Sequence, residues 1–192
     1  MVKTTASKTI AMSQSEAAEL LVTPTALGEL SVDDAKHVIA FMRPKRIAEG
    51  TVFIKEGEAA HTDYMLLVLK GDVTVESESS ASQENLIVSV MGPGSLIGEM
   101  GILDGAPRSA TCTAASDVTV AVLARDDLKR LMEQQPKVAA RFLMAMSTRM
   151  ADRLRETTRK LKSFSQVNRA LQQELNVLMD SRMPNTSSVR IK

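Results

Sequence analysis

One segment of the sequence combines the residue types that bind an anion: glycines, an acid, an arginine and a serine at close spacing. It covers residues 98–111 and reads GEMGILDGAPRSAT. The planar guanidinium of Arg108 can donate paired, charge-assisted hydrogen bonds to a phosphate, which a lysine ammonium cannot reproduce. Gly98 lets the chain approach an anion closely, and residues 99–103 can form one helical turn whose free N–H groups point at it. The segment adds a hydroxyl and a further backbone amide, from Ser109 and Ala110.

The segment resembles the phosphate-binding cassette of the cyclic nucleotide-binding domain family, which is shared by bacterial cAMP receptor protein and the regulatory subunits of cAMP-dependent kinase. The resemblance is carried by Gly98-Glu99, a short helical turn, and Arg108-Ser109-Ala110. With the flanking order of helix, β-roll and later helices it covers about residues 28–160. It implies a cyclic nucleotide ligand, cAMP or cGMP, while a cyclic dinucleotide stays open as an alternative.

The resemblance also implies roles for individual side chains. Arg108 would bind the cyclic phosphate. Glu99 would accept a hydrogen bond from the ribose 2′-hydroxyl and so select ribose over deoxyribose. Within the cassette, further ligand contacts are implied for Gly98, Met100, Ser109 and Ala110. On the strand before the cassette, Val88 and Ser89 would line the pocket beside the base. On a C-terminal helix, Thr157 and Thr158 would contact the base.

Short runs of β-branched and aliphatic residues, separated by glycines and polar turns, surround the cassette and are typical of a compact all-β unit. They predict strands over residues 51–54, 64–69, 73–76, 85–91, 109–114 and 118–124, with a polar loop over residues 77–84. Before them, Ser31 is a predicted N-cap of an amphipathic helix that ends before Pro44. We therefore expect a mainly β plus α fold, a jelly-roll-like β-roll with short flanking helices.

The C-terminal part of the sequence predicts one long helix over about residues 137–179, because no glycine or proline occurs between Pro136 and Pro184. Apolar residues recur there in steps of three and four, the coiled-coil pattern. Positions a are Leu154, Leu161, Asn168 and Leu175, and positions d are Met150, Thr157, Phe164, Leu171 and Leu178. A buried amide at an a position favours a parallel, in-register pair. We expect a homodimer through residues 150–178; the alternative is packing on the chain's own β unit, which we expect through about Leu143.

The predicted domain organisation has four parts. Residues 1–27 form a flexible arm that can become helical near residues 16–21. Residues 28–136 form the β-roll, residues 137–180 the dimerisation helix and residues 181–192 a disordered tail.

Composition excludes several classes of protein. The 24 basic and 23 acidic residues nearly cancel, which favours neither nucleic acid nor a membrane surface. A single cysteine, Cys112, excludes an internal disulfide, and no Cys/His cluster has zinc spacing, so no metal is expected. No apolar run is long enough for a signal peptide or a spanning helix, so we expect a cytoplasmic protein. No acid, base or nucleophile accompanies the anion-binding segment, so an enzyme is not expected.

We therefore predict a dimeric cAMP sensor that regulates a protein partner the sequence does not identify. Only nine residues follow Met183, so a C-terminal DNA-reading domain is not expected. One alternative is a nucleic-acid regulator that uses residues 141–169, where eight basic residues accompany two acidic ones. A solvated coiled-coil face requires the same residues, so sequence-specific DNA binding is not expected. The other alternative is a dimer scaffold without a ligand.

Overall fold

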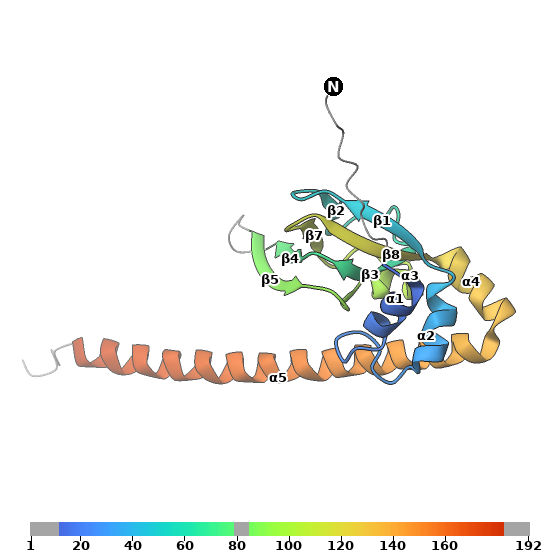
Figure 1. Ribbon diagram of the computed structural model, residues 1–192. Coiled ribbons are helices and arrows are strands. Elements are labelled where there is room, and N and C mark those ends of the chain that lie inside the picture. Colours follow the sequence, from blue (N-terminus) through green and yellow to red (C-terminus); the bar gives the residue numbers. More distant parts are fainter. Residues whose placement is uncertain (1–11, 79–84, 183–192) are drawn as a thin grey trace, which may run out of the picture. The chain divides into compact units, whose positions relative to one another are not determined.

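The computed structural model describes residues 12–78 and 85–182 (Figure 1). The chain forms two structural units, Met1–Arg149 and Met150–Lys192. The first contains both sheets and most of the helices. The second is described on its own below.

Within the described residues, two four-stranded antiparallel sheets form the first unit (Figure 1). In spatial order, one sheet contains β1 (Arg43–Ile47), β8 (Val118–Ala124), β3 (Tyr64–Lys70) and β6 (Leu96–Ile97). The other contains β2 (Val52–Ile54), β7 (Thr111–Ala114), β4 (Val73–Glu78) and β5 (Asn85–Met91). The predicted fold class, a β-roll with short helices and a long C-terminal helix, is confirmed.

Strand β3 connects two hydrophobic cores because it is buried on both faces. Leu66 and Val68 belong to a core that also contains Val75 and Cys112 of the other sheet. The alternate residues of β3 belong to a second core shared with the helices: Met65, Leu67 and Leu69. Successive side chains of a strand point to opposite faces, so one strand can supply both cores. The continuous run of apolar residues in β3 follows from this position.

The first helix, α1 (Gln14–Leu21), forms within the predicted arm and includes residues 16–21, where the sequence allowed a helix. Ser13 and Glu16 form a reciprocal capping box at its start. Its apolar face is buried in the helical core: Ala17, Ala18 and Leu21. The burial of this helix depends on partners far along the chain, which its own short apolar spacing does not reveal. Residues 1–11 lie outside the described residues.

Two strands were not predicted, β1 and β6. Strand β1 contains Pro44 and lies at the edge of its sheet, where a residue without an N–H is tolerated. Three of its residues are exposed and charged, so no alternation of polar and apolar residues marks it: Arg43, Lys45 and Arg46. Strand β6 has only two residues. Of the predicted polar loop, residues 79–84 lie outside the described residues, and β4 extends into its beginning.

Helices α2 (Val32–Ile39), α4 (Arg125–Gln134) and α5 (Pro136–Arg182) complete the helical part. Helix α5 is continuous, which confirms the predicted long helix. Its first turns pack in the helical core with Val138, Ala139, Phe142, Ala145 and Met146. Packing on the chain's own domain therefore reaches one turn beyond the expected limit at Leu143.

One ion pair joins α2 to the first turns of α5. Arg141 donates to both carboxylate oxygens of the buried Asp34 at 3.1 Å, and Ser31 donates to the same carboxylate at 2.8 Å. Burial raises the pKa of Asp34, but the hydrogen bonds from Ser31 and Arg141 outweigh it, so this pKa lies below its ordinary 3.8. The ionised carboxylate therefore stabilises the folded state.

Replacing Asp34 with alanine is expected to lower the free energy of unfolding by about 1–3 kcal/mol at neutral pH, because two donors lose their acceptor. Since the folded pKa is depressed, this contribution is present above pH 3.8 and is lost as the pH falls through the folded value. Urea unfolding at neutral and acidic pH measures both effects. The neighbouring exposed Asp33 provides the control, and an Asp33→Ala loss as large as that of Asp34→Ala would contradict the assignment.

Candidate functional site

The cassette folds as a short helix between two glycines in left-handed backbone conformations. Helix α3 (Glu99–Asp104) begins after Gly98, whose φ is 80°, and ends before Gly105, whose φ is 71°. Other residue types are strained there by roughly 1–2 kcal/mol. Glycine at both positions therefore allows the chain to turn sharply into and out of α3.

Two glycines also leave room for the guanidinium of Arg108. A Cβ atom on Gly98 would lie 2.6 Å from Nη1 of Arg108, and one on Gly101 would lie 2.9 Å from the same atom. Both separations are shorter than van der Waals contact. Glycine at these positions therefore lets the guanidinium lie against the backbone of α3.

Arg108 is held by backbone carbonyls. Only 5 % of the residue is exposed. Its Nη2 donates to the carbonyl oxygens of His61 at 2.9 Å and Tyr64 at 3.1 Å, and its Nη1 donates to that of Gly98 at 3.3 Å. Its Cζ lies 4.4 Å from the centre of the Tyr64 ring, within range of a cation–π interaction. These contacts fix one orientation of the guanidinium.

The hydrogen bonds of Arg108 determine how it can bind a phosphate. A guanidinium clamps two anion oxygens through Nε and Nη2 or through Nη1 and Nη2, so both forks include Nη2. Both N–H groups of Nη2 already donate to carbonyl oxygens, those of His61 and Tyr64. A two-point clamp on an anion therefore requires Arg108 to exchange at least one carbonyl for a ligand oxygen.

The other predicted cassette residues lie beside Arg108. Glu99 is the first residue of α3 and is partly buried. Met100 and Ser109 are exposed, and the Ser109 hydroxyl lies 4.0 Å from the Met100 sulfur. Ala110 packs against the core between the sheets. The structure thus brings the two ends of the cassette together.

The contacts predicted for Val88 and Ser89 remain predictions. Ser89 lies opposite Val75 of β4, and Val75 lies opposite Cys112 of β7. Because opposite residues of antiparallel strands share a face, Ser89 lies on the sheet face that carries the buried Val75. Its own side chain is exposed. The backbone of Val88 belongs to β5, and its side chain lies outside the described residues.

Thr157 and Thr158 belong to the second structural unit, and their contacts with a base also remain predictions. Their hydroxyls donate to carbonyl oxygens one helical turn earlier, those of Arg153 at 2.8 Å and Leu154 at 2.9 Å. A hydroxyl that donates in this way keeps its oxygen lone pairs for accepting a hydrogen bond.

Arg108 is held in position by two residues, His61 and Tyr64, that the sequence analysis did not identify. Among the described residues, His61 is the one non-glycine residue with a positive φ, which is 54°. Its carbonyl oxygen accepts a hydrogen bond from Arg108. The hydroxyl of Tyr64 donates to the carbonyl of Phe53 at 3.2 Å. Burial raises the pKa of Tyr64 above its ordinary 10.0; the Arg108 guanidinium opposes this rise and the Glu58 carboxylate adds to it. No spacing rule connects these residues with the cassette.

Arg125 holds the other end of α3. From the start of α4, its Nη2 donates to the carbonyl of Gly101 at 2.7 Å and its Nε donates to that of Ile102 at 3.1 Å. The Gly101 carbonyl also accepts from the N–H of Gly105 at 2.9 Å, so Arg125 adds a second donor there and a donor for the carbonyl of Ile102 near the end of the short helix. The sequence did not predict this role, because nothing near Arg125 along the chain connects it with the carbonyls of α3.

Replacing Gly98 with alanine is expected to destabilise the protein more than the same change at Gly50. Both glycines have a positive φ, 80° and 76°, so both variants incur a strain of about 1–2 kcal/mol. A Cβ atom meets nothing within 4 Å at Gly50 but overlaps Arg108 at Gly98. Displacing the anchored guanidinium adds roughly 1 kcal/mol for the lost hydrogen bond. Equal midpoints of chemical unfolding for the two variants would contradict this role of Gly98.

The described part of the chain has no group of three or more His, Cys, Asp or Glu side chains that could hold a metal ion. Among the described helices, none combines the length and the apolar character needed to cross a membrane.

Comparison with known protein families identifies the family to which this domain belongs. The model of the cyclic nucleotide-binding domain matches residues 44–135, which include every strand except part of β1, the cassette and α4. The chain belongs to the cyclic nucleotide-binding domain family. Helix α3 and Arg108 lie within the matched residues.

One relative of this domain is a bacterial transcriptional regulator. The chain is 28 % identical over 120 residues to the CRP-like cAMP-activated global transcriptional regulator of Mycobacterium tuberculosis, a match that covers 62 % of this chain and 50 % of that protein. The chain thus spans about half the length of this relative. Its name describes a regulator and no enzymatic activity.

Solved structures of cyclic nucleotide-binding domains share the fold. A domain from Methylobacillus flagellatus has a TM-score of 0.64 and 29 % identity, with 74 % of this chain and 79 % of that chain covered. The N-terminal domain of a transcriptional regulator from Streptomyces coelicolor has a TM-score of 0.60 and 30 % identity, with 72 % and 94 % covered.

Proposed function

We propose that the protein is a sensor of a cyclic mononucleotide, with cAMP as its principal ligand. The observation that carries the proposal is the placement of Arg108, a buried cation held against the glycines of α3 and next to Ser109. A buried guanidinium of fixed orientation suits a ligand with a single phosphate charge. The Mycobacterium tuberculosis relative, named as cAMP-activated, supports the choice of ligand.

Each cassette residue has a role in this proposal. Arg108 exchanges a carbonyl partner for the cyclic phosphate, because both of its forks share Nη2. Ser109 and the N–H of Ala110 add donors to the same phosphate. Glu99 accepts a hydrogen bond from the ribose 2′-hydroxyl. Ligand binding therefore changes the contacts of Arg108 with His61 and Tyr64, which lie outside the cassette.

We also propose that the chain is a parallel homodimer through the α5 seam, defined as the a and d positions of residues 150–178. Six of its apolar members are between 51 % and 70 % exposed in the single chain: Leu154, Leu161, Phe164, Leu171, Leu175 and Leu178. Such a stripe along one helix is the face that a second copy covers in a coiled coil. Asn168 on the same seam would pair with its twin. The proposal places the dimer in the cytoplasm, where the buried Cys112 stays a thiol.

Calorimetric titration of the full chain with cAMP and cGMP tests the sensor proposal. Saturable binding of one molecule per chain is the expected result. Tyr64 offers a second readout, because the protein has one tyrosine and no tryptophan and the Arg108 guanidinium stacks on that tyrosine. Absence of heat and of any fluorescence change at millimolar concentrations of both nucleotides would overturn the proposal.

We expect cAMP to bind more tightly than cGMP, because the oxygens of Thr157 and Thr158 can accept from the adenine amino group. The Thr157→Ala/Thr158→Ala double variant should reduce the preference, with one neutral hydrogen bond worth about 0.5–1.5 kcal/mol. The Ser163→Ala variant is the control, since Ser163 bonds to its own helix in the same way. Equal affinities of the wild type for the two nucleotides, or a double variant with an unchanged preference, would show that α5 does not select the base.

A further inference from the structure

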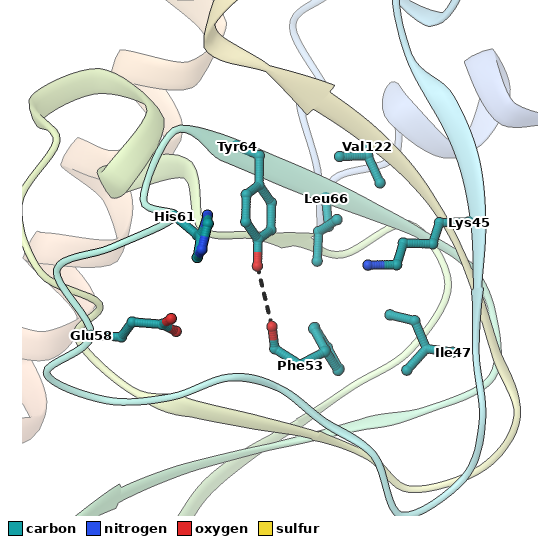
Figure 2. A pocket seen from close by; sticks show the side chains of 8 residues that line it. All are labelled: Lys45, Ile47, Phe53, Glu58, His61, Tyr64, Leu66 and Val122. Atoms are coloured by element: carbon teal, nitrogen blue, oxygen red, sulfur yellow. Dashed lines mark hydrogen bonds between the residues drawn. The ribbon is translucent and has the colours of Figure 1, made fainter.

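The β-roll contains a cavity that is separate from the cassette (Figure 2). Its volume is about 340 Å³, within the range of small-molecule sites. Its apolar lining comes from Ile47, Phe53, Leu66 and Val122, which belong to strands β1, β2, β3 and β8. Four strands thus shape the cavity, which makes its walls part of the folded core.

The polar lining carries opposite charges. Lys45 and Glu58 point into the cavity from opposite sides, and the Tyr64 hydroxyl lies between them (Figure 2). Neither charged side chain has a hydrogen bond or ion pair with another described residue, and they do not pair with each other. The fourth polar lining residue is His61. The cavity therefore offers one cation and one anion, separated by an apolar surface.

We infer that this cavity is a second ligand site, for a small zwitterion whose two charged groups are separated by an apolar chain. A carboxylate on the ligand pairs with Lys45, an ammonium group pairs with Glu58, and the chain between them covers Leu66 and Val122. A ligand with a single charge would pair with only one of the two charged residues and gain only one ion pair. The zwitterion is the class of ligand that satisfies both ends.

The second site is adjacent to Arg108 through a shared residue. Tyr64 lines the cavity, while its ring stacks on the Arg108 guanidinium and its carbonyl accepts from Nη2. A zwitterion that holds Tyr64 in place strengthens these contacts and opposes the exchange that a cyclic phosphate requires. Occupancy of the cavity therefore lowers affinity for the nucleotide, and this coupling rests on the proposed function.

Titration of the full chain with ε-aminocaproate, followed by Tyr64 fluorescence and calorimetry without nucleotide, tests the second site. Caproate and hexylamine serve as matched probes that carry one charge each. We expect saturable binding of ε-aminocaproate at millimolar concentration or below. Each single-charge probe should bind at least about fivefold more weakly, the scale of one partly exposed ion pair. No saturable signal, or equal affinities for the three probes, would overturn the inference.

Two neutral variants assign the ends of the ligand. Lys45→Gln should weaken ε-aminocaproate by about fivefold and strengthen hexylamine, because the repulsion of its ammonium is removed. Glu58→Gln should weaken ε-aminocaproate and strengthen caproate, because the repulsion of its carboxylate is removed. Lys70→Gln, at an exposed lysine that does not line the cavity, is the control. An unchanged affinity for ε-aminocaproate in both lining variants would overturn the site.

Repeating the titration with saturating cAMP tests the coupling. The affinity for ε-aminocaproate should fall at least about twofold, and by linkage the affinity for cAMP should fall by the same factor when the zwitterion saturates. Unchanged affinities would overturn the coupling. If cAMP itself does not bind, the proposed sensor function fails, whereas the zwitterion titration still decides the second site.

Discussion

Replacing Arg108 with lysine is expected to weaken cAMP binding by at least about tenfold, the effect of losing a hydrogen bond to a charged group. An ammonium keeps the positive charge but cannot donate through a planar fork. It also cannot reach the three carbonyls that now hold the guanidinium, those of His61, Tyr64 and Gly98. The loss should therefore appear in affinity and, to a smaller extent, in stability. Calorimetry and thermal unfolding measure the two effects separately.

Alanine at position 108 should abolish measurable cAMP binding and also lower stability by about 1–3 kcal/mol, because buried carbonyls lose their donor. Arg125→Lys is the matched control, since Arg125 also donates to carbonyls of α3 but is not assigned to the ligand. It should lower stability with little change in affinity. An Arg108→Lys variant with wild-type affinity, or an Arg125→Lys variant with the larger loss, would contradict the role of Arg108 as the phosphate ligand.

Glutamate at two seam positions, Leu161 and Leu171, is expected to convert the dimer into a monomer at micromolar concentration. Burying a leucine contributes about 1.5–3 kcal/mol, and a dimer buries each position twice. The introduced carboxylates would also face each other across the seam and repel. Multi-angle light scattering measures the mass of the particle. Val177→Glu is the control, because Val177 is as exposed as the seam residues but lies at an outer heptad position.

Replacing Asn168 with leucine, on the same seam, should stabilise the dimer instead of dissociating it. Exchanging a pair of amides for apolar packing raises the melting temperature, while the oligomeric state becomes less uniform because shifted or larger assemblies are then tolerated. Thermal unfolding and light scattering test the two parts. A monomeric wild type would contradict the dimer, and a destabilised Asn168→Leu dimer would show that Asn168 is not at a buried a position.

The cassette could be predicted because its determinants are local in sequence. Gly98 and Arg108 are ten residues apart, and a short helix with glycine at each end is enough to bring them into contact. The long helix was predicted for the same reason, since an uninterrupted helical period needs no information from the rest of the chain. Strands β5 and β8 were predicted with their observed bounds, because glycine or polar turns flank their β-branched runs.

Elements whose stability depends on distant partners were missed or only indicated: strand β1 was not predicted, and α1 was indicated only as a helical tendency within an arm. Helix α1 has eight residues and is stable because its small apolar face is buried in the helical core. Strand β1 pairs with β8, some seventy-five residues later in the chain, and its polar sequence contains nothing that marks a strand. In both cases tertiary contacts outweigh local preference.

By itself the sequence predicted an anion-binding segment, because a planar cation, two flanking glycines and a serine at fixed spacing are a local arrangement. Only the tertiary structure decided how Arg108 is held. Its partners His61 and Tyr64 precede it by 47 and 44 residues, and they meet it because β3 and β7 belong to facing sheets. The cavity beside Tyr64 has the same origin, since its charges come from Lys45 of β1 and Glu58 of the loop between β2 and β3. Such contacts follow from the packing of one sheet against the other. This packing depends on the volume and shape of side chains throughout the core. The periodicity of the sequence contains no information about that three-dimensional fit.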